Sequence, residues 1–226
     1  MPLDHAYEGT RARVETYFDR TATRTWERLT SDAPVSGIRA TVRAGRDRMR
    51  ELILAQLPHD LRGARLLDAG CGTGAMAVEL AARGADVIAV DISPALVEIA
   101  EKRCPAQLRG RITFVAGDML DPRLGSFDHA VAMDSMIYYD ARSIASKLAE
   151  AAPRLGQGLI FTVAPRTPLL MVMWRAGKLF PRSDRSPTMV PHSPAKLAKE
   201  LTTGNLTEIE RVTSGFYISQ ALRFRP

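Results

Sequence analysis

Cysteine is scarce in this sequence, since the 226 residues include only Cys71 and Cys104. Two cysteines cannot form the disulfide framework that stabilises small secreted domains. The sequence also has no C-x-x-C pair and no cluster of histidines, so it predicts no structural zinc and no protein-bound metal. Cys71 stands inside a glycine-rich turn, where a small side chain fits. We interpret it as a filler of that turn and not as a nucleophile.

Long apolar runs and targeting signals are absent as well. No stretch approaches the ~20 consecutive apolar residues that cross a bilayer. Residues 1–5 lack the basic-then-apolar pattern of a secretion signal, so we expect a cytoplasmic protein. A chain of this length can bury the core of one domain, or of one domain with an appended lid.

A dense basic segment is the third missing feature. The net charge is +6 and the pI is near 9.7, but the arginines are spread from Arg11 to Arg225. This spread argues against a nucleic-acid-binding stripe. It favours recognition of carboxylates, which match the planar guanidinium fork. A genome composition rich in arginine is the alternative explanation.

Apolar strands and helical segments alternate regularly from residue 65 onward. Near-continuous apolar strands separated by helices indicate a parallel sheet that is covered on both faces. The last two strands flank Gly215, and a tight hairpin there makes one strand antiparallel. The sequence therefore predicts an α/β fold with a Rossmann-like, seven-stranded, mostly parallel sheet. The expected strands are 65–69, 86–91, 111–116, 127–133, 158–164, 206–213 and 216–225, and the expected helices are 10–29, 36–57, 74–83, 95–103, 141–152 and 194–203.

Two segments lie outside a minimal sheet of this kind. Residues 1–58 are expected to form an N-terminal helical arm or lid, and residues 59–226 the main domain. Within the main domain, residues 166–192 are an insert after the fifth strand. The first half of the insert is apolar and rich in methionine, which suits an adaptable hydrophobic surface.

The run from Leu66 to Gly74, Leu-Leu-Asp-Ala-Gly-Cys-Gly-Thr-Gly, connects the first strand to the next helix. Glycines at alternate positions permit a tight turn and let a ligand lie against the backbone. The spacing is tighter than G-x-G-x-x-G, and no Lys-Ser or Lys-Thr follows, so the run is not a phosphate-binding P-loop. The acid before the first glycine suits a ligand with an ammonium group. This pattern is typical of class I methyltransferases, which use S-adenosylmethionine (SAM).

Acids also end the next strands, and the carboxyl ends of parallel strands form the ligand-binding edge of such a sheet. We expect Asp68 to face the methionine ammonium of SAM, Asp91 to accept from the ribose hydroxyls and Asp118 from the adenine amino group. A strand-end aspartate is often a helix cap or turn former, and a nicotinamide-binding or non-catalytic Rossmann-like protein is the alternative. The predicted cofactor-binding residues of this edge are Asp68, Gly70, Cys71, Gly72, Asp91, Ile92, Asp118, Met119 and Met133.

The segment from Met133 to Tyr139 restricts the methyl acceptor. It lacks the Asn/Asp-Pro-Pro-Tyr/Phe motif of enzymes that methylate amino groups of DNA bases. Metal-assisted catechol methylation needs a cluster of acids, and only Asp134 and Asp140 are available here. We therefore expect an acceptor that needs little chemical activation.

Four segments carry a resemblance to the magnesium-protoporphyrin IX O-methyltransferases. They are 17–28 (Tyr-Phe-Asp-Arg-Thr-Ala-Thr-Arg-Thr-Trp-Glu-Arg), 38–46, 134–139 and 180–192, and the likeness covers nearly the whole chain. Members from oxygenic phototrophs usually have Ile-His-Tyr where this chain has Ile137-Tyr138-Tyr139. The arginine-rich sequence with tyrosine therefore looks more like the bacteriochlorophyll branch.

The resemblance implies transfer of a methyl group from SAM to one propionate of magnesium-protoporphyrin IX. The product is the monomethyl ester, an intermediate of (bacterio)chlorophyll biosynthesis. A propionate is ionised at neutral pH, so this nucleophile needs no general base. Catalysis then depends on in-line positioning and on exclusion of water.

The resemblance also suggests residues beyond the sheet edge. Tyr138 is expected to orient the reacting propionate, and His192 to ligate the porphyrin magnesium or bind a propionate. Tyr17 is expected to close over SAM, and Arg43 to pair with the SAM carboxylate. Core packing for Tyr17 and a surface ion pair for Arg43 are the alternatives. The predicted substrate-binding residues are Trp174, Arg182 and Arg185.

The family resemblance further suggests a handoff of the porphyrin from the porphyrin-binding subunit of magnesium chelatase, and peripheral contact with the photosynthetic membrane. Two rival functions stay open from the sequence. One is a SAM-dependent O-methyltransferase that acts on a quinone-pathway or other small acceptor. The other is a non-catalytic porphyrin carrier that retains the SAM-binding fold.

Overall fold

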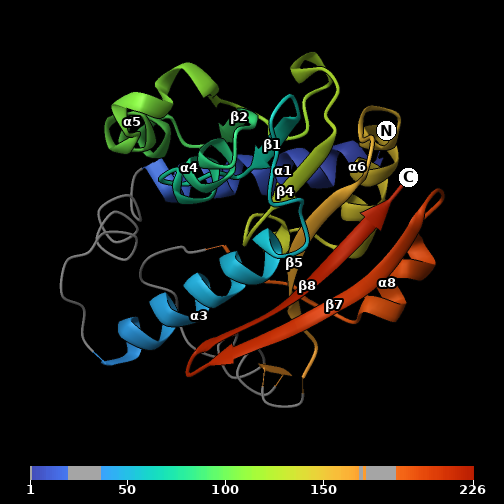
Figure 1. Cartoon of the computed structure of the whole chain (residues 1–226). Helices are drawn as coiled ribbons and strands as arrows, with labels where there is room; N and C mark the ends of the chain where they lie inside the picture. Colours follow the sequence, from blue (N-terminus) through green and yellow to red (C-terminus); the bar gives the residue numbers. More distant parts are fainter. Residues whose placement is uncertain (1, 20–36, 168–169, 172–186) are drawn as a thin grey trace.

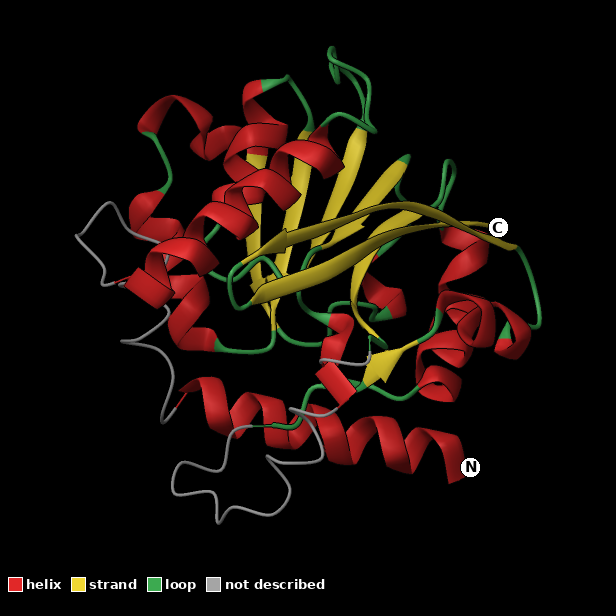
Figure 2. Cartoon of the chain, turned by 90° about the horizontal axis from the view of Figure 1, so that it is seen from below, coloured by secondary structure: helices red, strands yellow, loops and turns green. Residues whose placement is uncertain are grey.

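A computed structural model describes residues 2–19, 37–167, 170–171 and 187–226. These residues form a central sheet with helices on both faces (Figures 1 and 2). The predicted α/β class is confirmed. Trp174, Arg182 and Arg185 lie outside the described residues, as does most of the insert.

The main sheet has the strand order β3-β2-β1-β4-β5-β8-β7. The first five strands are parallel to one another, and β8 runs antiparallel to both of its neighbours, β5 and β7. The sequence did not predict β6, a two-residue strand that pairs with β5. The strands are β1 (Arg65–Ala69), β2 (Asp86–Asp91), β3 (Ile112–Ala116), β4 (His129–Ala132), β5 (Leu159–Pro165), β6 (Pro191–His192), β7 (Asn205–Ser214) and β8 (Tyr217–Arg225).

Alternate residues of the strands enter two separate cores, because successive side chains of a strand point to opposite faces. On β1, Leu66 packs with α3 and α4, whereas Leu67 packs on the opposite face with α6 and α8. All seven residues of β5 are buried, as expected for a strand covered on both faces. The helices are α1 (Pro2–Tyr17), α3 (Gly37–Leu54), α4 (Ala75–Ala82), α5 (Pro94–Arg103), α6 (Ala141–Ala151) and α8 (Pro194–Glu200).

The first helix differs from the prediction of 10–29. It begins at Pro2 and ends at Tyr17, and residues 20–36 lie outside the described part of the chain. Tyr7, Val14 and Phe18 are its buried side chains, and their spacing of seven and four places them on one helix face. The prediction missed the start because residues 2–6 carry little hydrophobic periodicity.

Helix α1 lies across the carboxyl ends of the parallel strands (Figure 2). Near its start, the Tyr7 ring stacks on Tyr139 with centroids 4.8 Å apart, and the Lys147 ammonium of α6 lies over the same ring. Near its end, Val14 and Phe18 pack on Leu96 of α5. The described parts of the proposed arm, 1–58, are thus α1 and α3. Among the described residues, no helix is both long and apolar enough to cross a membrane.

Candidate active site

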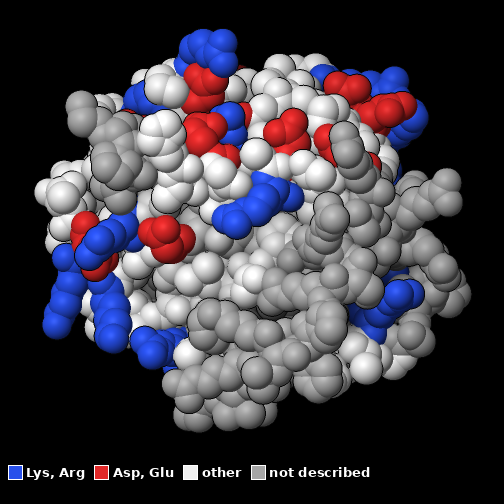
Figure 3. Space-filling model, turned by 180° about the vertical axis from the view of Figure 1, so that it is seen from behind, with Lys and Arg blue, Asp and Glu red and all other residues white. Residues whose placement is uncertain are grey.

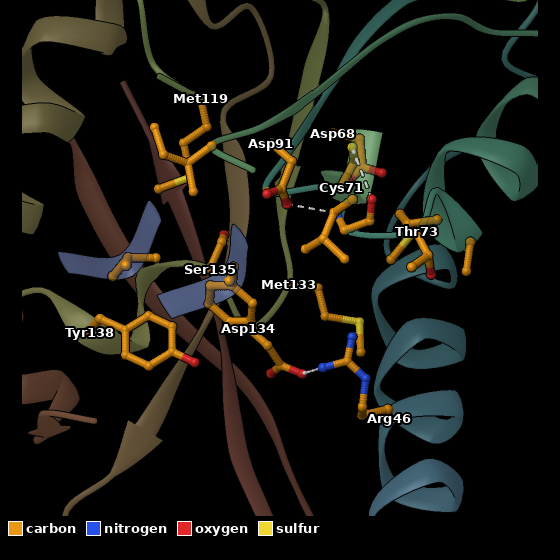
Figure 4. Close-up of a pocket in the computed structure, with 18 of the residues that line it drawn as sticks. Arg46, Asp68, Cys71, Thr73, Asp91, Met119, Met133, Asp134, Ser135 and Tyr138 are labelled. Carbon is orange, nitrogen blue, oxygen red and sulfur yellow. Dashed lines mark hydrogen bonds and ion pairs between the residues drawn. The ribbon is translucent and has the colours of Figure 1, made fainter. Parts of the chain in front are cut away.

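A cavity of about 320 Å³ lies where the carboxyl ends of β1, β2 and β4 meet, between α1 and α3 (Figure 4). This is the point where the strand order reverses, which is where open α/β sheets bind their ligands.

The glycine-rich turn after β1 forms one wall of the cavity. Gly70, Gly72 and Gly74 have φ angles of +83°, +54° and +83°, a left-handed conformation that side chains rarely adopt. A Cβ on Gly70 would overlap the side chain of Ser135, so this position also needs the space. The N–H groups of Gly70 and Cys71 both donate to the Val90 carbonyl, at 2.7 and 2.9 Å, and hold the turn against β2.

Asp68, at the end of β1, is a buried carboxyl group with one oxygen that lacks a hydrogen-bond donor among the described residues. It is 1% exposed, and its Oδ2 has no hydrogen-bond partner among the described residues. Burial, and then the nearby charge of Asp91, raise the pKa of Asp68 to about 7, although the Ala77 N–H opposes this shift. A cationic ligand at this oxygen would favour the charged form, and the ammonium of SAM fits that need.

Asp91, at the end of β2, is fixed by the backbone. Its Oδ2 accepts from the Gly72 N–H at 2.8 Å, and its Oδ1 accepts from the Ser93 N–H at 3.0 Å. Burial raises the pKa of this carboxyl, and these backbone donors oppose the shift. The carboxylate is therefore held in one orientation beside the glycine turn, and its further lone pairs can accept hydrogen bonds from a ligand.

Asp118, after β3, links the sheet edge to α1. Its Oδ1 accepts from the Tyr7 hydroxyl at 3.0 Å and from the Leu120 N–H at 2.9 Å, and its Oδ2 accepts from Arg11 Nη1 at 3.1 Å. The Arg11 Nε is buried and has no partner among the described residues. The residue predicted to hold adenine therefore also fastens α1 over the cavity.

Asp134, just beyond β4, is the centre of a polar cluster. Arg46 of α3 donates to its Oδ2 at 2.5 Å, and the Tyr217 hydroxyl donates to its Oδ1 at 3.0 Å. The Thr162 hydroxyl donates to Oδ1 at 3.1 Å and accepts from the Asp134 N–H at 2.8 Å. Asp134 has a φ of +57°, which is strained for a residue other than glycine, and these contacts hold it there.

Tyr138 and Cys71 line the same cavity with neutral groups. Burial, and then the charge of Asp134, raise the pKa of Tyr138, so its hydroxyl stays protonated and can donate a hydrogen bond. In Figure 4 this hydroxyl points toward the side of the cavity that holds Asp134. Burial raises the pKa of the Cys71 thiol, which fits the interpretation of this residue as a filler.

The structure brings most of the predicted site residues together. Tyr17 does not line the cavity, but its ring packs edge-on against Phe18, which does. His192 also lies away from the lining: it is 4% exposed, and its Nε2 contacts the Tyr139 carbonyl at 2.9 Å. The predicted residues that line the cavity are Asp68, Gly70, Cys71, Gly72, Asp91, Ile92, Asp118, Met119, Met133, Tyr138 and Arg43.

Sequence reasoning missed the residues that reach the cavity from other segments. The spacing of three and four between Arg43, Arg46 and Arg50 places all three on one face of α3, and this signal could have been read. Tyr7 and Tyr217 carry no comparable signal, because each reaches the site from a distant part of the chain. The missed residues that carry polar or aromatic chemistry are Tyr7, Arg11, Arg46, Asp47, Arg50, Thr73, Asp134, Ser135 and Tyr139 on the lining, with Tyr217 behind it.

A glycine turn after β1 and acids at the next strand ends define a class I, SAM-dependent methyltransferase. Two protein-family models match this sequence. The model of the methyltransferase domain matches residues 66–158, and the model of the magnesium-protoporphyrin IX methyltransferase C-terminus matches residues 132–226. The chain belongs to the magnesium-protoporphyrin O-methyltransferase family. The predicted family and the predicted use of SAM are confirmed.

Three relatives illustrate the similarity. The chain is 56% identical to a magnesium-protoporphyrin O-methyltransferase of Rhodobacter capsulatus, with 100% of both chains covered. It is 29% identical to the chloroplastic magnesium protoporphyrin IX methyltransferase of Arabidopsis thaliana, over 96% of this chain and 72% of that protein. A crystal structure of the Synechocystis PCC 6803 magnesium protoporphyrin IX methyltransferase with bound SAH matches with a TM-score of 0.82 and 27% identity, covering 95% of this chain and 99% of the other.

Proposed function

We propose that this protein transfers the methyl group of SAM to a propionate carboxylate of magnesium-protoporphyrin IX and releases the monomethyl ester. The observation that carries the proposal is the 56% identity to the Rhodobacter capsulatus protein over the full chain, because it covers the donor site and the remaining segments alike. The reaction belongs to (bacterio)chlorophyll biosynthesis.

The donor site follows from the charges at the strand ends. Asp68 holds the methionine ammonium, since its buried Oδ2 has no other partner among the described residues. Asp91 accepts from the ribose hydroxyls, and Ile92 packs on the adenine. Asp118 and Met119 complete the adenine site beneath α1, while Arg43 pairs with the SAM carboxylate.

The transfer itself needs little from the protein beyond alignment. A carboxylate oxygen attacks the methyl carbon, the C–O bond forms as the S–C bond breaks, and the electron pair stays on sulfur. Because the propionate is already ionised at neutral pH, no group has to remove a proton. The protein holds the two reactants in line and keeps water away from the carboxylate. Tyr138 contributes a neutral hydroxyl that orients this carboxylate.

The remaining predicted residues keep their roles as proposals, except that the roles of His192 and Tyr17 are revised. Trp174 covers the macrocycle, and Arg182 or Arg185 binds the propionate that is not methylated. His192 contacts the carbonyl of Tyr139. We therefore assign it to positioning the adjacent Tyr138, in place of direct contact with the porphyrin. Tyr17 supports the cavity through Phe18.

The test is transfer of a labelled methyl group from SAM. The purified protein should esterify magnesium-protoporphyrin IX once and leave its dimethyl ester unlabelled, because the ester has no free carboxylate. Transfer to a quinone-pathway hydroxyl acceptor in place of the porphyrin would overturn the proposal. Tight porphyrin binding without any transfer would instead indicate a carrier.

Two associations extend this proposal. One is direct handoff of the porphyrin from the porphyrin-binding subunit of magnesium chelatase, which the family resemblance suggests. Peripheral contact with the photosynthetic membrane is supported by the net charge of +6 and by the exposed apolar side chains of Ile38, Met189 and Phe216.

A further inference from the structure

Two groups of charged side chains line different parts of the cavity. Asp68 and Asp91 lie at the carboxyl ends of β1 and β2, with Asp118 beyond β3, whereas Arg43, Arg46 and Arg50 come from one face of α3. Each group also holds charges of the opposite sign, since Arg11 pairs with Asp118, Arg46 with Asp134 and Arg50 with Asp47. In Figure 4, Asp68 and Asp91 lie on one side of Met133, and Arg46 lies on the other. The acidic side matches the ammonium of the donor. The arginine side therefore faces the anionic groups of both reactants.

Arg46 belongs to a network of polar groups from several elements. Its Nη1 donates to Asp134 at 2.5 Å, and its side chain is only 20% exposed. Asp134 is fixed in turn by hydroxyl groups from β5 and β8, those of Thr162 and Tyr217. The ion pair therefore combines a strained residue with supports from two strands, and such strain collects at functional sites. By contrast, Arg50 pairs with Asp47 on its own helix.

The proposed reaction brings three carboxylates to the protein, one on SAM and two on the porphyrin. A guanidinium presents five N–H donors along its edges, and it can bridge two carboxylates at once. Arg46 lines the cavity beside Met133 and Asp134, on the side to which the Tyr138 hydroxyl points. A carboxylate placed between Arg46 and Tyr138 would meet donors on two sides.

We propose that Arg46 binds the reacting carboxylate of the porphyrin and aligns one of its oxygens with the methyl group, with Asp134 as the positioning residue that sets the guanidinium plane. This inference rests on the proposed function and adds a specific acceptor-binding residue to it. The carboxylate accepts from Arg46 and Tyr138 while a second lone pair attacks the methyl carbon. The ion pair with Asp134 persists through the reaction because Asp134 has its own donors.

Arg46→Gln tests the inference, with Arg48→Gln as the matched control. Arg48 lies on the same helix, but its side chain is 65% exposed and pairs with Glu210 at 3.5 Å, outside the cavity. The measurement is titration of magnesium-protoporphyrin IX and of its dimethyl ester, followed by absorption, into protein saturated with S-adenosylhomocysteine. Arg46→Gln should weaken binding of the diacid roughly ten- to a hundredfold and leave binding of the diester unchanged. Arg48→Gln should change neither.

The double variant Arg46→Gln/Asp134→Asn separates binding from folding. Arg46→Gln alone leaves Asp134 without its cationic partner, so a lower Tm could account for lost activity. The double variant removes both charges and should recover the Tm, while kcat/KM and the preference for the diacid stay low. If the double variant also recovers kcat/KM and the preference for the diacid, Arg46 only supports the fold, and the inference is overturned.

Two further results have distinct meanings. If Arg46→Gln weakens SAM binding and leaves the diacid preference intact, Arg46 holds the donor carboxylate and the inference is wrong. If the folded wild-type protein binds SAM but neither binds nor methylates magnesium-protoporphyrin IX, the proposed function itself fails. These two failures are distinguishable because the first appears only in the variant and the second in the wild type.

Discussion

Burial disfavours the ionised form of the Asp68 carboxyl group. In the unfolded chain this carboxyl ionises near its ordinary pKa of 3.8, whereas burial in the folded protein raises the pKa to about 7. Between these values the folded state binds the extra proton, so the free energy of unfolding falls as pH rises from about 4 to 7. A cation that binds the charged form offsets this cost, and SAM affinity should therefore weaken below pH ~7.

Asp68→Asn should remove this pH dependence. At about 1.4 kcal/mol per pKa unit, we expect it to abolish a slope worth up to roughly 4 kcal/mol between pH 4 and 7 in the ligand-free protein. Chemical denaturation at several pH values measures the slope, and the same variant should lose stabilisation by SAM. Asp86→Asn is the control, because Asp86 is also on a strand flanking the site but its side chain is 68% exposed. A slope that persists in Asp68→Asn would show that another group titrates.

The turn between β1 and α4 constrains Gly70 in two ways, through its left-handed backbone and through the close approach of Ser135. Two glycine variants separate these constraints. Gly70→Ala adds both the strain of a φ of +83° and an overlap with Ser135, whereas Gly63→Ala adds only strain at a φ of +78°, with open space around its Cβ. We expect Gly63→Ala to cost about 1–2 kcal/mol of stability and to keep SAM affinity. Gly70→Ala should cost more and abolish SAM binding, measured by calorimetric titration. Equal effects of the two variants would contradict the assigned role of the Gly70 turn.

Helix α1 is fastened through Asp118, and removal of a single hydroxyl tests this attachment. Tyr7→Phe keeps the stacking on Tyr139 but loses the 3.0 Å hydrogen bond to Asp118. We expect a loss of ~0.5–1.5 kcal/mol in docking of the helix, seen as faster amide exchange in α1. Thr16→Val is the control, since the Thr16 hydroxyl bonds only within α1, to the Ala12 carbonyl. Unchanged exchange in Tyr7→Phe would mean that the Arg11–Asp118 ion pair and the apolar packing hold the helix without this hydrogen bond.

The sequence was sufficient to place the strands of the main sheet and the strand-end acids that line the cavity, because both depend on local signals. The strand β1 was predicted over 65–69, and Asp68 and Asp91 follow from the rule that ligands bind at strand ends. The cluster around Asp134 was not predictable in this way. It joins α3, β5 and β8, and neither the left-handed backbone of Asp134 nor the approach of Tyr217 leaves a pattern in the sequence.

For the molecule as a whole, charge and exposed apolar side chains bear on the proposed contact with a membrane. In Figure 3, basic side chains of the described residues lie beside acidic ones in several places on the face shown. Ile38, at the start of α3, and Phe216, in the β7–β8 turn, are 60% and 61% exposed. These two segments are joined, since the Ser214 hydroxyl donates to the Thr41 carbonyl at 2.9 Å.

The double variant Ile38→Ser/Phe216→Ser tests this surface. Because each buried apolar side chain contributes about 1.5–3 kcal/mol, we expect a loss of at least tenfold in binding to vesicles of anionic lipid, measured by sedimentation. Methyl transfer to dissolved porphyrin should be retained, because neither residue lines the cavity. Met189→Ser gives a single-site comparison at another exposed apolar residue. Unchanged vesicle binding by the double variant would rule out this surface as the contact.

The ion pair of Arg46 and Asp134 at the cavity has a consequence for turnover. The reacting groups are a sulfonium cation and a carboxylate anion, and methyl transfer converts them into a neutral thioether and a neutral ester. Arg46, held in place by Asp134, then faces an ester that no longer carries the charge it attracts. Arg46 thus loses its electrostatic attraction for the esterified group at the moment of transfer, while the second propionate keeps its charge. Loss of charge on both reacting groups therefore favours dissociation of the products. We expect inhibition by the monomethyl ester to be weak.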